Sequence, residues 1–129
     1  MKKELINKAY EAMKHSYSPY SGFRVGAALL TKSGKIYTGC NIENSAFSPT
    51  CCAERTAFFK AVSEGEKDFS AMAIVGGKSG ETSEFCYPCG VCRQVMAEFC
   101  NADFEIILTN GKDIKAKKLS ELLPESFKL

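Results

Sequence analysis

The pattern of apolar and polar positions divides the first third of the chain into one helix and two strands. Apolar residues recur at helical spacing over residues 4–15, and the run SYSPYSG at 16–22 stops this pattern. Apolar and polar residues then alternate over 23–29, and a second run covers 35–40 after a Ser-Gly turn. The pattern therefore predicts a helix followed by a β-hairpin.

A helix and a buried strand come next. Apolar residues form a helical stripe over residues 53–62, and Gly65 ends it. The run AMAIVG at 71–76 is short, apolar and bounded by polar residues, which is typical of a strand buried on both faces.

A second helix and strand follow the same plan. The helical stripe on this segment consists of Val91, Val95 and Phe99, and the run FEIILT at 104–109 predicts another buried strand. The dipeptide Asn110–Gly111 is a strong hairpin signal, so a strand over 113–116 should return antiparallel to its predecessor. A short helical tail completes the chain.

Helices that alternate with buried strands predict an α/β fold. We expect a three-layer α/β/α sandwich around a mixed five-stranded sheet, in which helices cover both faces. The 129 residues match a single domain, spanning 1–129, and 45% hydrophobic with 25% charged residues is ordinary for a globular protein.

Charge and the N-terminal segment narrow the range of partners. A formal net charge of +2 gives no overall field that would favour nucleic acid or a membrane, and we interpret the lysines over 112–118 as a solvated strand edge. The first residues, MKKELINKAYEAMK, lack the apolar run of a signal peptide or membrane span. We therefore expect a cytoplasmic protein with a small-molecule partner.

Seven cysteines suggest chemistry rather than a disulfide framework, because the number is odd and cytoplasmic thiols are kept reduced. Cys89 and Cys92 lie three residues apart at the start of a predicted helix. Taken alone, this spacing fits a zinc site and a thioredoxin-like dithiol equally well.

The segment CCAER at 51–55 decides between these two interpretations. Cys52 and Glu54 are two residues apart at the start of the other long helix, and they can share a pocket only at that helix end. Two converging helix N-termini favour thiolates. Thiolates from Cys52, Cys89 and Cys92 would fill three corners of a zinc tetrahedron and leave the fourth for water, as in catalytic zinc sites, with Glu54 available as a non-ligand proton shuttle.

This combination resembles the nucleobase deaminases, which hold zinc with a His or Cys plus PCxxC and use a non-ligand Glu. The segments at 17–30, 41–44, 52–55 and 88–94 all resemble the cytidine deaminase family, in its small, homotetrameric, three-cysteine form. The resemblance implies one zinc ion per subunit. It also implies hydrolysis of cytidine and 2'-deoxycytidine to the uridines and ammonia, for pyrimidine salvage.

The resemblance further implies roles for individual residues. Glu54 would be the proton shuttle, and Arg55 would donate hydrogen bonds to the ligand thiolates. The nucleoside would be held by the sugar-binding pair Asn41 and Glu43, by Phe23, by the backbone beside Ala53, and by Phe127 of a neighbouring subunit. Phe47 stands where some relatives carry tyrosine, which removes a hydroxyl from the pocket.

Other assignments remain open from the residues alone. Cys51 and Cys86 offer alternative thiols, although the motif alignment selects 52, 89 and 92. We expect Cys40 and Cys100 to be small buried hydrophobes and His15 to end the first helix.

Three other functions fit the sequence less well. A polynucleotide deaminase is disfavoured by the 110–111 hairpin, because the editing enzymes run their last strands parallel. A deaminase of a nucleoside-like antibiotic is disfavoured by NIEN and SGFRVGAAL. A non-catalytic zinc or redox module would leave Glu54 without a purpose.

Overall fold

The computed structural model describes residues 1–129 and contains one five-stranded sheet with helices on both sides. The sheet order is β2-β1-β3-β4-β5. In chain order the elements are α1 (Lys2–Met13), β1 (Phe23–Thr31), β2 (Ile36–Cys40), α2 (Ala53–Ser63), β3 (Phe69–Lys78), α3 (Gly90–Phe99), β4 (Glu105–Thr109), β5 (Ile114–Lys118) and α4 (Leu119–Leu122). The predicted α/β/α sandwich and its mixed sheet are confirmed.

The sheet is mixed because one of its four strand pairs is parallel. β3 and β4 run parallel and are joined through α3, whereas β1 pairs antiparallel with both β2 and β3. β4 and β5 form the predicted antiparallel hairpin, with Thr109 opposite Ile114. Gly111 lies in this turn at φ 89°, a left-handed conformation that glycine adopts without steric cost.

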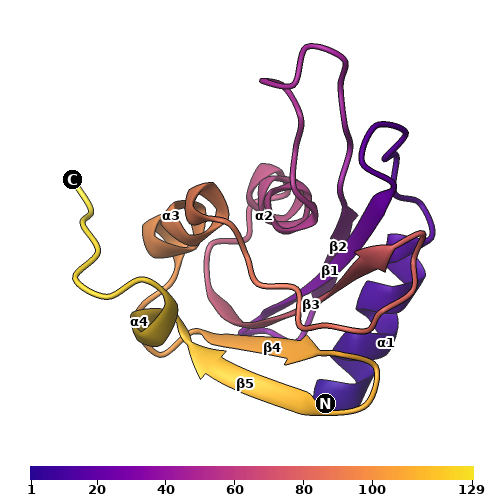
Figure 1. Ribbon diagram of the computed structural model, residues 1–129. Coiled ribbons are helices and arrows are strands. Elements are labelled where there is room, and N and C mark those ends of the chain that lie inside the picture. Colours follow the sequence, from indigo (N-terminus) through magenta and orange to yellow (C-terminus); the bar gives the residue numbers. More distant parts are fainter.

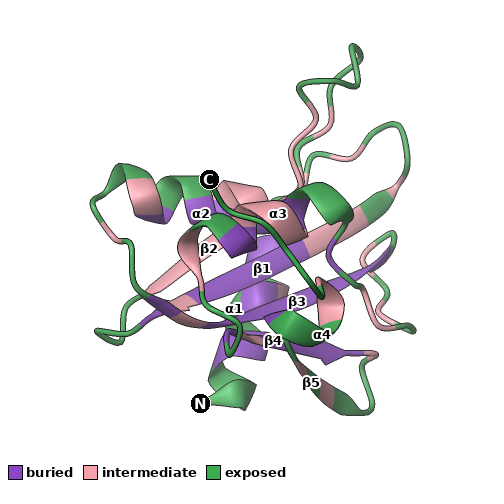
Figure 2. Ribbon diagram, turned by 90° about the vertical axis from the view of Figure 1, so that its left-hand side faces the viewer, coloured by how far each residue is buried: buried purple, intermediate pink, exposed green.

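Each face of the sheet has its own apolar core. On one face α1 packs Leu5, Ile6 and Ala9 against small residues of β1 and β3. On the other face α2 and α3 lie side by side (Figure 1), and Phe58 of α2 and Phe104 are the largest fully buried side chains there. The central strands β1 and β3 are buried along most of their length, as Figure 2 shows.

Glycine in the sheet lets α2 approach β2 closely. A β-carbon at Gly39 would lie 2.5 Å from the Ala53 carbonyl oxygen and 2.6 Å from the Ala57 amide nitrogen. No side chain fits in that space, so the first turn of α2 rests directly on the strand.

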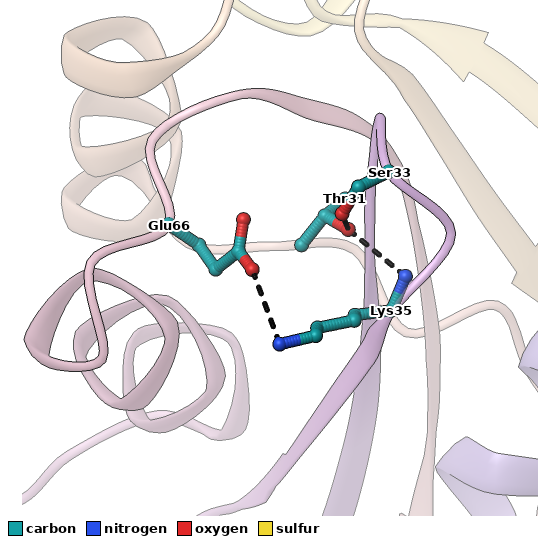
Figure 3. Close-up of polar contacts among 4 residues, drawn as sticks. All are labelled: Thr31, Ser33, Lys35 and Glu66. Carbon is teal, nitrogen blue, oxygen red and sulfur yellow. Dashed lines mark hydrogen bonds and ion pairs between the residues drawn. The ribbon is translucent and has the colours of Figure 1, made fainter.

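The β1–β2 turn is held by a buried hydroxyl. Thr31 Oγ1 accepts a hydrogen bond from the Lys35 amide at 2.9 Å and pairs with Ser33 Oγ at 2.9 Å (Figure 3). The Lys35 ammonium lies 3.8 Å from Glu66, beyond the end of α2. This turn therefore joins the edge of the sheet to the loop that follows α2.

Two details of the sequence-based prediction are wrong. The first helix ends at Met13 rather than at residue 15, so His15 lies beyond it and is exposed. In α3 the buried residues are Cys92, Met96 and Ala97, and Val91 of the predicted stripe is 58% exposed. The helix is rotated so that Cys92 faces inward, as the site described below requires. None of the helices has both the length and the apolarity of a membrane span.

Candidate functional site

Three cysteines meet where the N-termini of α2 and α3 converge. Cys52 is the N-cap of α2 and Cys89 is the N-cap of α3, while Cys92 lies in the first turn of α3. Cys52 Sγ lies 3.7 Å from Cys89 Sγ, which lies 3.5 Å from Cys92 Sγ. The backbone N–H of Cys92 points at Cys89 Sγ from 3.5 Å, so the helix end itself favours negative charge on sulfur.

The spacing of these sulfurs fits zinc. Zinc–sulfur bonds of about 2.3 Å at tetrahedral angles place ligand sulfurs about 3.8 Å apart. All three sulfurs lie within 4.8 Å of one another, and no other group of three metal-ligating side chains is drawn together in this way. Three ligands leave one tetrahedral position open, which distinguishes catalytic from structural zinc sites.

Arg55 supplies positive charge to the cluster. Its Nη2 donates a hydrogen bond to Cys52 Sγ at 3.3 Å. In the metal-free chain, hydrogen bonds from the Cys92 thiol and from Arg55 lower the pKa of Cys52 to about 5, whereas the pKa of Cys92, the thiol that donates, is raised. Cys52 therefore becomes a thiolate before Cys92 does.

Glu54 lies beside the cluster and is almost completely buried, with 4% of its surface exposed. Burial raises the pKa of its carboxyl group to about 7 because the charged form loses its hydration. The negative charge of Cys52 acts in the same direction. A carboxyl group with this pKa can both accept and donate a proton near neutral pH.

The two alternative cysteines lie outside the cluster. Cys51 Sγ accepts a hydrogen bond from Thr56 Oγ1 at 3.6 Å, and its backbone pairs with Ile42. Cys86 Sγ packs against Gly76, where a β-carbon would lie only 2.8 Å away, and burial raises its pKa to about 12. Cys40 and Cys100 are half-buried rather than fully buried.

Asn41 is held at the end of β2 by hydrogen bonds to β1. Its side-chain oxygen accepts from the Val25 amide at 2.9 Å and from the Ser16 hydroxyl, and its Nδ2 donates to the Phe23 carbonyl at 2.8 Å. Asn41 therefore connects two segments and keeps one Nδ2 hydrogen available. Phe23, one of its partners, is 39% exposed.

Glu43 lies in the loop that follows Asn41, and its carboxylate is held by a second loop. The amides of Tyr20 and Ser21 donate to Oε1 at 2.9 and 3.1 Å, and the Ser21 hydroxyl donates to Oε2. These bonds, the hydroxyl first, lower the pKa of Glu43. Sequence reasoning assigned no role to Tyr20 or Ser21, because the run that contains them was interpreted only as the end of a helix and as part of a family motif.

A cavity of about 410 Å³ lies between these two loops. Tyr20 and Phe47 meet there edge to face, with ring centroids 6.4 Å apart, and Ser21, Glu43 and Thr50 complete the lining. Both loops project beyond the end of the sheet (Figure 1). Phe47 is 72% exposed, so this cavity is open to solvent within one chain.

The structure brings some predicted site residues together and leaves others apart. Cys52, Ala53, Glu54 and Arg55 share the first turn of α2, beside the cysteines of α3. Phe127 lies in the C-terminal tail and is 67% exposed, and its carbonyl accepts a hydrogen bond from Gln94 at 3.2 Å. Its predicted role therefore needs a second chain.

Comparison with known proteins assigns the family. The family model described as the cytidine and deoxycytidylate deaminase zinc-binding region matches residues 1–108. The chain belongs to this family. Cytidine deaminase from Sporosarcina psychrophila is 54% identical over 96% of this chain and 89% of its own, and that from Halalkalibacterium halodurans is 51% identical over 95% and 91%.

The fold agrees with this family. The crystal structure of cytidine deaminase from Burkholderia pseudomallei matches with a TM-score of 0.89 and 43% identity, and the match covers 97% of this chain and 98% of that one. Zinc is the metal of this family domain, and the three sulfurs have the spacing to bind it.

Proposed function

We propose that this protein is a zinc-dependent cytidine deaminase that hydrolyses cytidine and 2'-deoxycytidine to uridine and 2'-deoxyuridine. Water adds to C4 of the pyrimidine, the bond between C4 and the amino nitrogen breaks, and ammonia leaves. The observation that carries this proposal is the buried Glu54 carboxyl group beside three converging thiols.

Glu54 performs the proton transfers. Cys52, Cys89 and Cys92 would hold zinc, which would supply Lewis acidity and lower the pKa of a water molecule to about 7. Glu54, whose own pKa is raised to about 7, accepts a proton from that water and delivers it to N3. After water has added, the resulting Glu54 carboxylate takes the remaining proton from the new hydroxyl at C4 and gives it to the amino nitrogen, which leaves as ammonia.

Arg55 offsets the charge of the ligand set. Three thiolates and Zn²⁺ sum to a charge of −1, which weakens the metal as a Lewis acid. The hydrogen bond from Arg55 to Cys52 draws electron density away from that sulfur, so part of the Lewis acidity is retained.

The loops beside β1 and β2 select a nucleoside. Asn41 and Glu43 lie two residues apart after β2 and bind the ribose hydroxyls, while Phe23 and the backbone beside Ala53 contact the pyrimidine. Hydrogen bonds keep Glu43 ionised by lowering its pKa, so a phosphate on the sugar would be repelled. The substrate is therefore a nucleoside and not a nucleotide.

The active enzyme is a cytoplasmic homotetramer that serves pyrimidine salvage. Phe47 and Phe127 are both largely exposed in one chain and lie on segments that extend from its body. In the assembly Phe127 reaches the pyrimidine bound by a neighbouring subunit and stacks on it, a contact worth about 1–3 kcal/mol.

The absorbance of cytidine during incubation with the zinc-loaded protein tests this function. We expect conversion to uridine, with free cytosine a poor substrate because it lacks the sugar. Glu43→Ala should raise the KM for cytidine and leave zinc content unchanged. Glu4→Ala is its matched control, because Glu4 is an exposed carboxylate on α1, on the face of the sheet opposite α2 and α3. Turnover of cytosine as fast as cytidine would contradict the sugar-binding role, and no turnover of cytidine would contradict the proposed reaction.

A further inference from the structure

One arginine of α3 contacts both the loop that carries a zinc ligand and the root of the C-terminal tail. Arg93 Nε donates to the Pro88 carbonyl at 2.8 Å, and Arg93 Nη1 donates to the Leu122 carbonyl at 2.6 Å. The guanidinium makes no ion pair with a carboxylate of this chain. Its two nitrogens thus hold two backbone oxygens from segments far apart in sequence.

The first of these contacts lies next to the zinc site. Pro88 is buried and directly precedes Cys89, the N-cap of α3 and a zinc ligand. A buried carbonyl needs a hydrogen-bond partner, and Arg93 provides it. The Pro88–Cys89 peptide, and with it the direction of the Cys89 sulfur, therefore depends on this guanidinium.

The second contact lies where the tail begins. Leu122 is the last residue of α4, and carbonyls at a helix end lack partners within the helix. One residue along α3, Gln94 Nε2 donates to the Phe127 carbonyl at 3.2 Å. The first turns of α3 thus hold the tail at two points, on the side where Figure 1 shows it leaving α4.

From this arrangement we propose that Arg93 is a positioning residue that couples the zinc-ligand loop to the C-terminal tail. The planar fork of a guanidinium holds both oxygens at once, which an ammonium group cannot do with the same geometry. Binding of zinc restricts the motion of the loop at Pro88. Because Arg93 is hydrogen-bonded to both Pro88 and Leu122, it then also restricts the motion of Leu122 and of the tail that contains Phe127. Coupling of this kind is reciprocal, so loss of the tail contact also weakens retention of zinc.

Two measurements on the zinc-loaded protein test the coupling, and neither depends on the proposed reaction. The first is the rate at which zinc passes to a chromogenic chelator. The second is hydrogen–deuterium exchange of a peptide over 119–129, where the amides of Leu119, Ser120 and Leu123 are hydrogen-bonded to backbone oxygens. A peptide from α1 serves as the internal reference for exchange.

Arg93→Met should release zinc at least about tenfold faster than the parent, the usual effect of removing a residue that supports a metal ligand. Exchange in the 119–129 peptide should rise, while exchange in α1 stays unchanged. Arg24→Met is the matched control, because the Arg24 guanidinium has only a 3.4 Å contact with the Lys14 carbonyl, and it should leave both measurements within about twofold of the parent.

Removal of zinc gives the decisive comparison. Stripping zinc from the parent should raise exchange in the 119–129 peptide, whereas in Arg93→Met the same treatment should add nothing, because the link is already lost. The proposal is overturned if stripping zinc leaves the parent's tail unchanged, or if it raises exchange equally in both proteins. The proposal is also overturned if Arg93→Met changes the rate of zinc release but not exchange in the 119–129 peptide, or the reverse.

Arg93→Lys keeps the test valid should the methionine variant not fold. Lysine retains the charge but reaches one carbonyl at a time, so zinc release and tail exchange should both lie between the parent and the methionine variant. If the folded lysine variant keeps the parental rate of zinc release and the parental tail exchange, then a guanidinium that holds both carbonyls at once is not needed and the proposal is contradicted.

Discussion

The zinc corner, formed by Cys52, Glu54, Cys89 and Cys92, is held by helix ends and contains a buried carboxyl group. The two loops that project beyond the sheet are exposed. At the corner, helix ends bring Cys52, Glu54 and Cys89 together over a packed sheet, and Glu54 is 4% exposed. The loops at 16–22 and 41–51 carry Tyr20 and Phe47, which contact each other but leave Phe47 72% exposed.

This difference separates two parts of the proposed enzyme. Rigid elements of a single chain are sufficient to hold the metal and the proton shuttle, because every neighbour they need is present in that chain. The projecting loops and the tail instead expose aromatic residues, because Phe47 is 72% exposed despite its contact with Tyr20 and Phe127 is 67% exposed. Substitutions at the zinc corner should therefore lower turnover. Substitutions that remove a contact between subunits should instead raise the KM for the nucleoside.

The largest expected effect is loss of the metal. Cys52→Ala, Cys89→Ala or Cys92→Ala should each reduce zinc from one ion per chain to nearly none, because two thiolates and water form a poor zinc site. Metal analysis of the purified variants measures this. Cys51→Ala and Cys86→Ala are matched controls that should keep their zinc, and an empty Cys51→Ala site beside a filled Cys52→Ala site would show that the ligand set is wrong.

The next effect is on turnover. Glu54→Gln should retain zinc and fold but lose turnover of cytidine by about 10²- to 10⁴-fold or more, because one carboxyl group serves several proton transfers. Steady-state kinetics with cytidine measures it. Glu64→Gln, at the other end of α2, makes the same chemical change on the surface and should keep parental turnover. Activity of Glu54→Gln near the parent would remove this residue from the mechanism.

Glu54 also predicts a pH dependence of stability in the zinc-free protein. The unfolded chain releases this proton near pH 4.5 and the folded chain near pH 7, so the folded state loses stability as pH rises between these values. The difference corresponds to about 3 kcal/mol. Glu54→Gln has no proton to lose, so its unfolding free energy relative to the parent should rise by this amount from pH 4.5 to pH 8.

Urea denaturation of both proteins with chelator present measures this difference. A constant difference between the two proteins across the pH range would show that Glu54 is not buried as an uncharged acid.

The smallest effect concerns assembly. Phe127→Ala should keep zinc but raise the KM for cytidine about 10- to 100-fold, which corresponds to the loss of one stacked aromatic ring. Leu129→Ala, also exposed in the tail, is the control and should keep the parental KM.

Reassembly of Phe127→Ala chains with Glu54→Gln chains tests whether one active site uses residues of two subunits. A mixed tetramer pairs an intact Glu54 with an intact Phe127 from the other chain. Mixed assemblies no more active than their parents would contradict a shared site.

Local signals in the sequence were sufficient to predict much of the fold. The Asn110–Gly111 turn predicted the β4–β5 hairpin, and buried apolar runs predicted β3 and β4. Each of these signals lies within a few neighbouring residues. The cysteine spacing likewise predicted that α2 and α3 would converge, because ligands of one metal must meet.

Features that depend on partners distant in sequence were not predicted. Apolar spacing placed Val91 on the buried face of α3, but the inward position of Cys92 sets the rotation of the helix and turns Val91 outward. Arg93 reaches Leu122 and Ser21 reaches Glu43, and no nearby residue indicates either contact. A long polar side chain can bond to many backbone groups, so its partner follows only from the fold.

The missing side chain at Gly39 has an evolutionary consequence. Any larger residue there would push against Ala53 and Ala57, which follow Cys52 in the first turns of α2. The distance between Cys52 and the cysteines of α3 would change with that displacement. Selection for activity should therefore act on residue 39, an edge-strand position that is not itself a metal ligand, because a larger side chain there would disturb the metal site through α2.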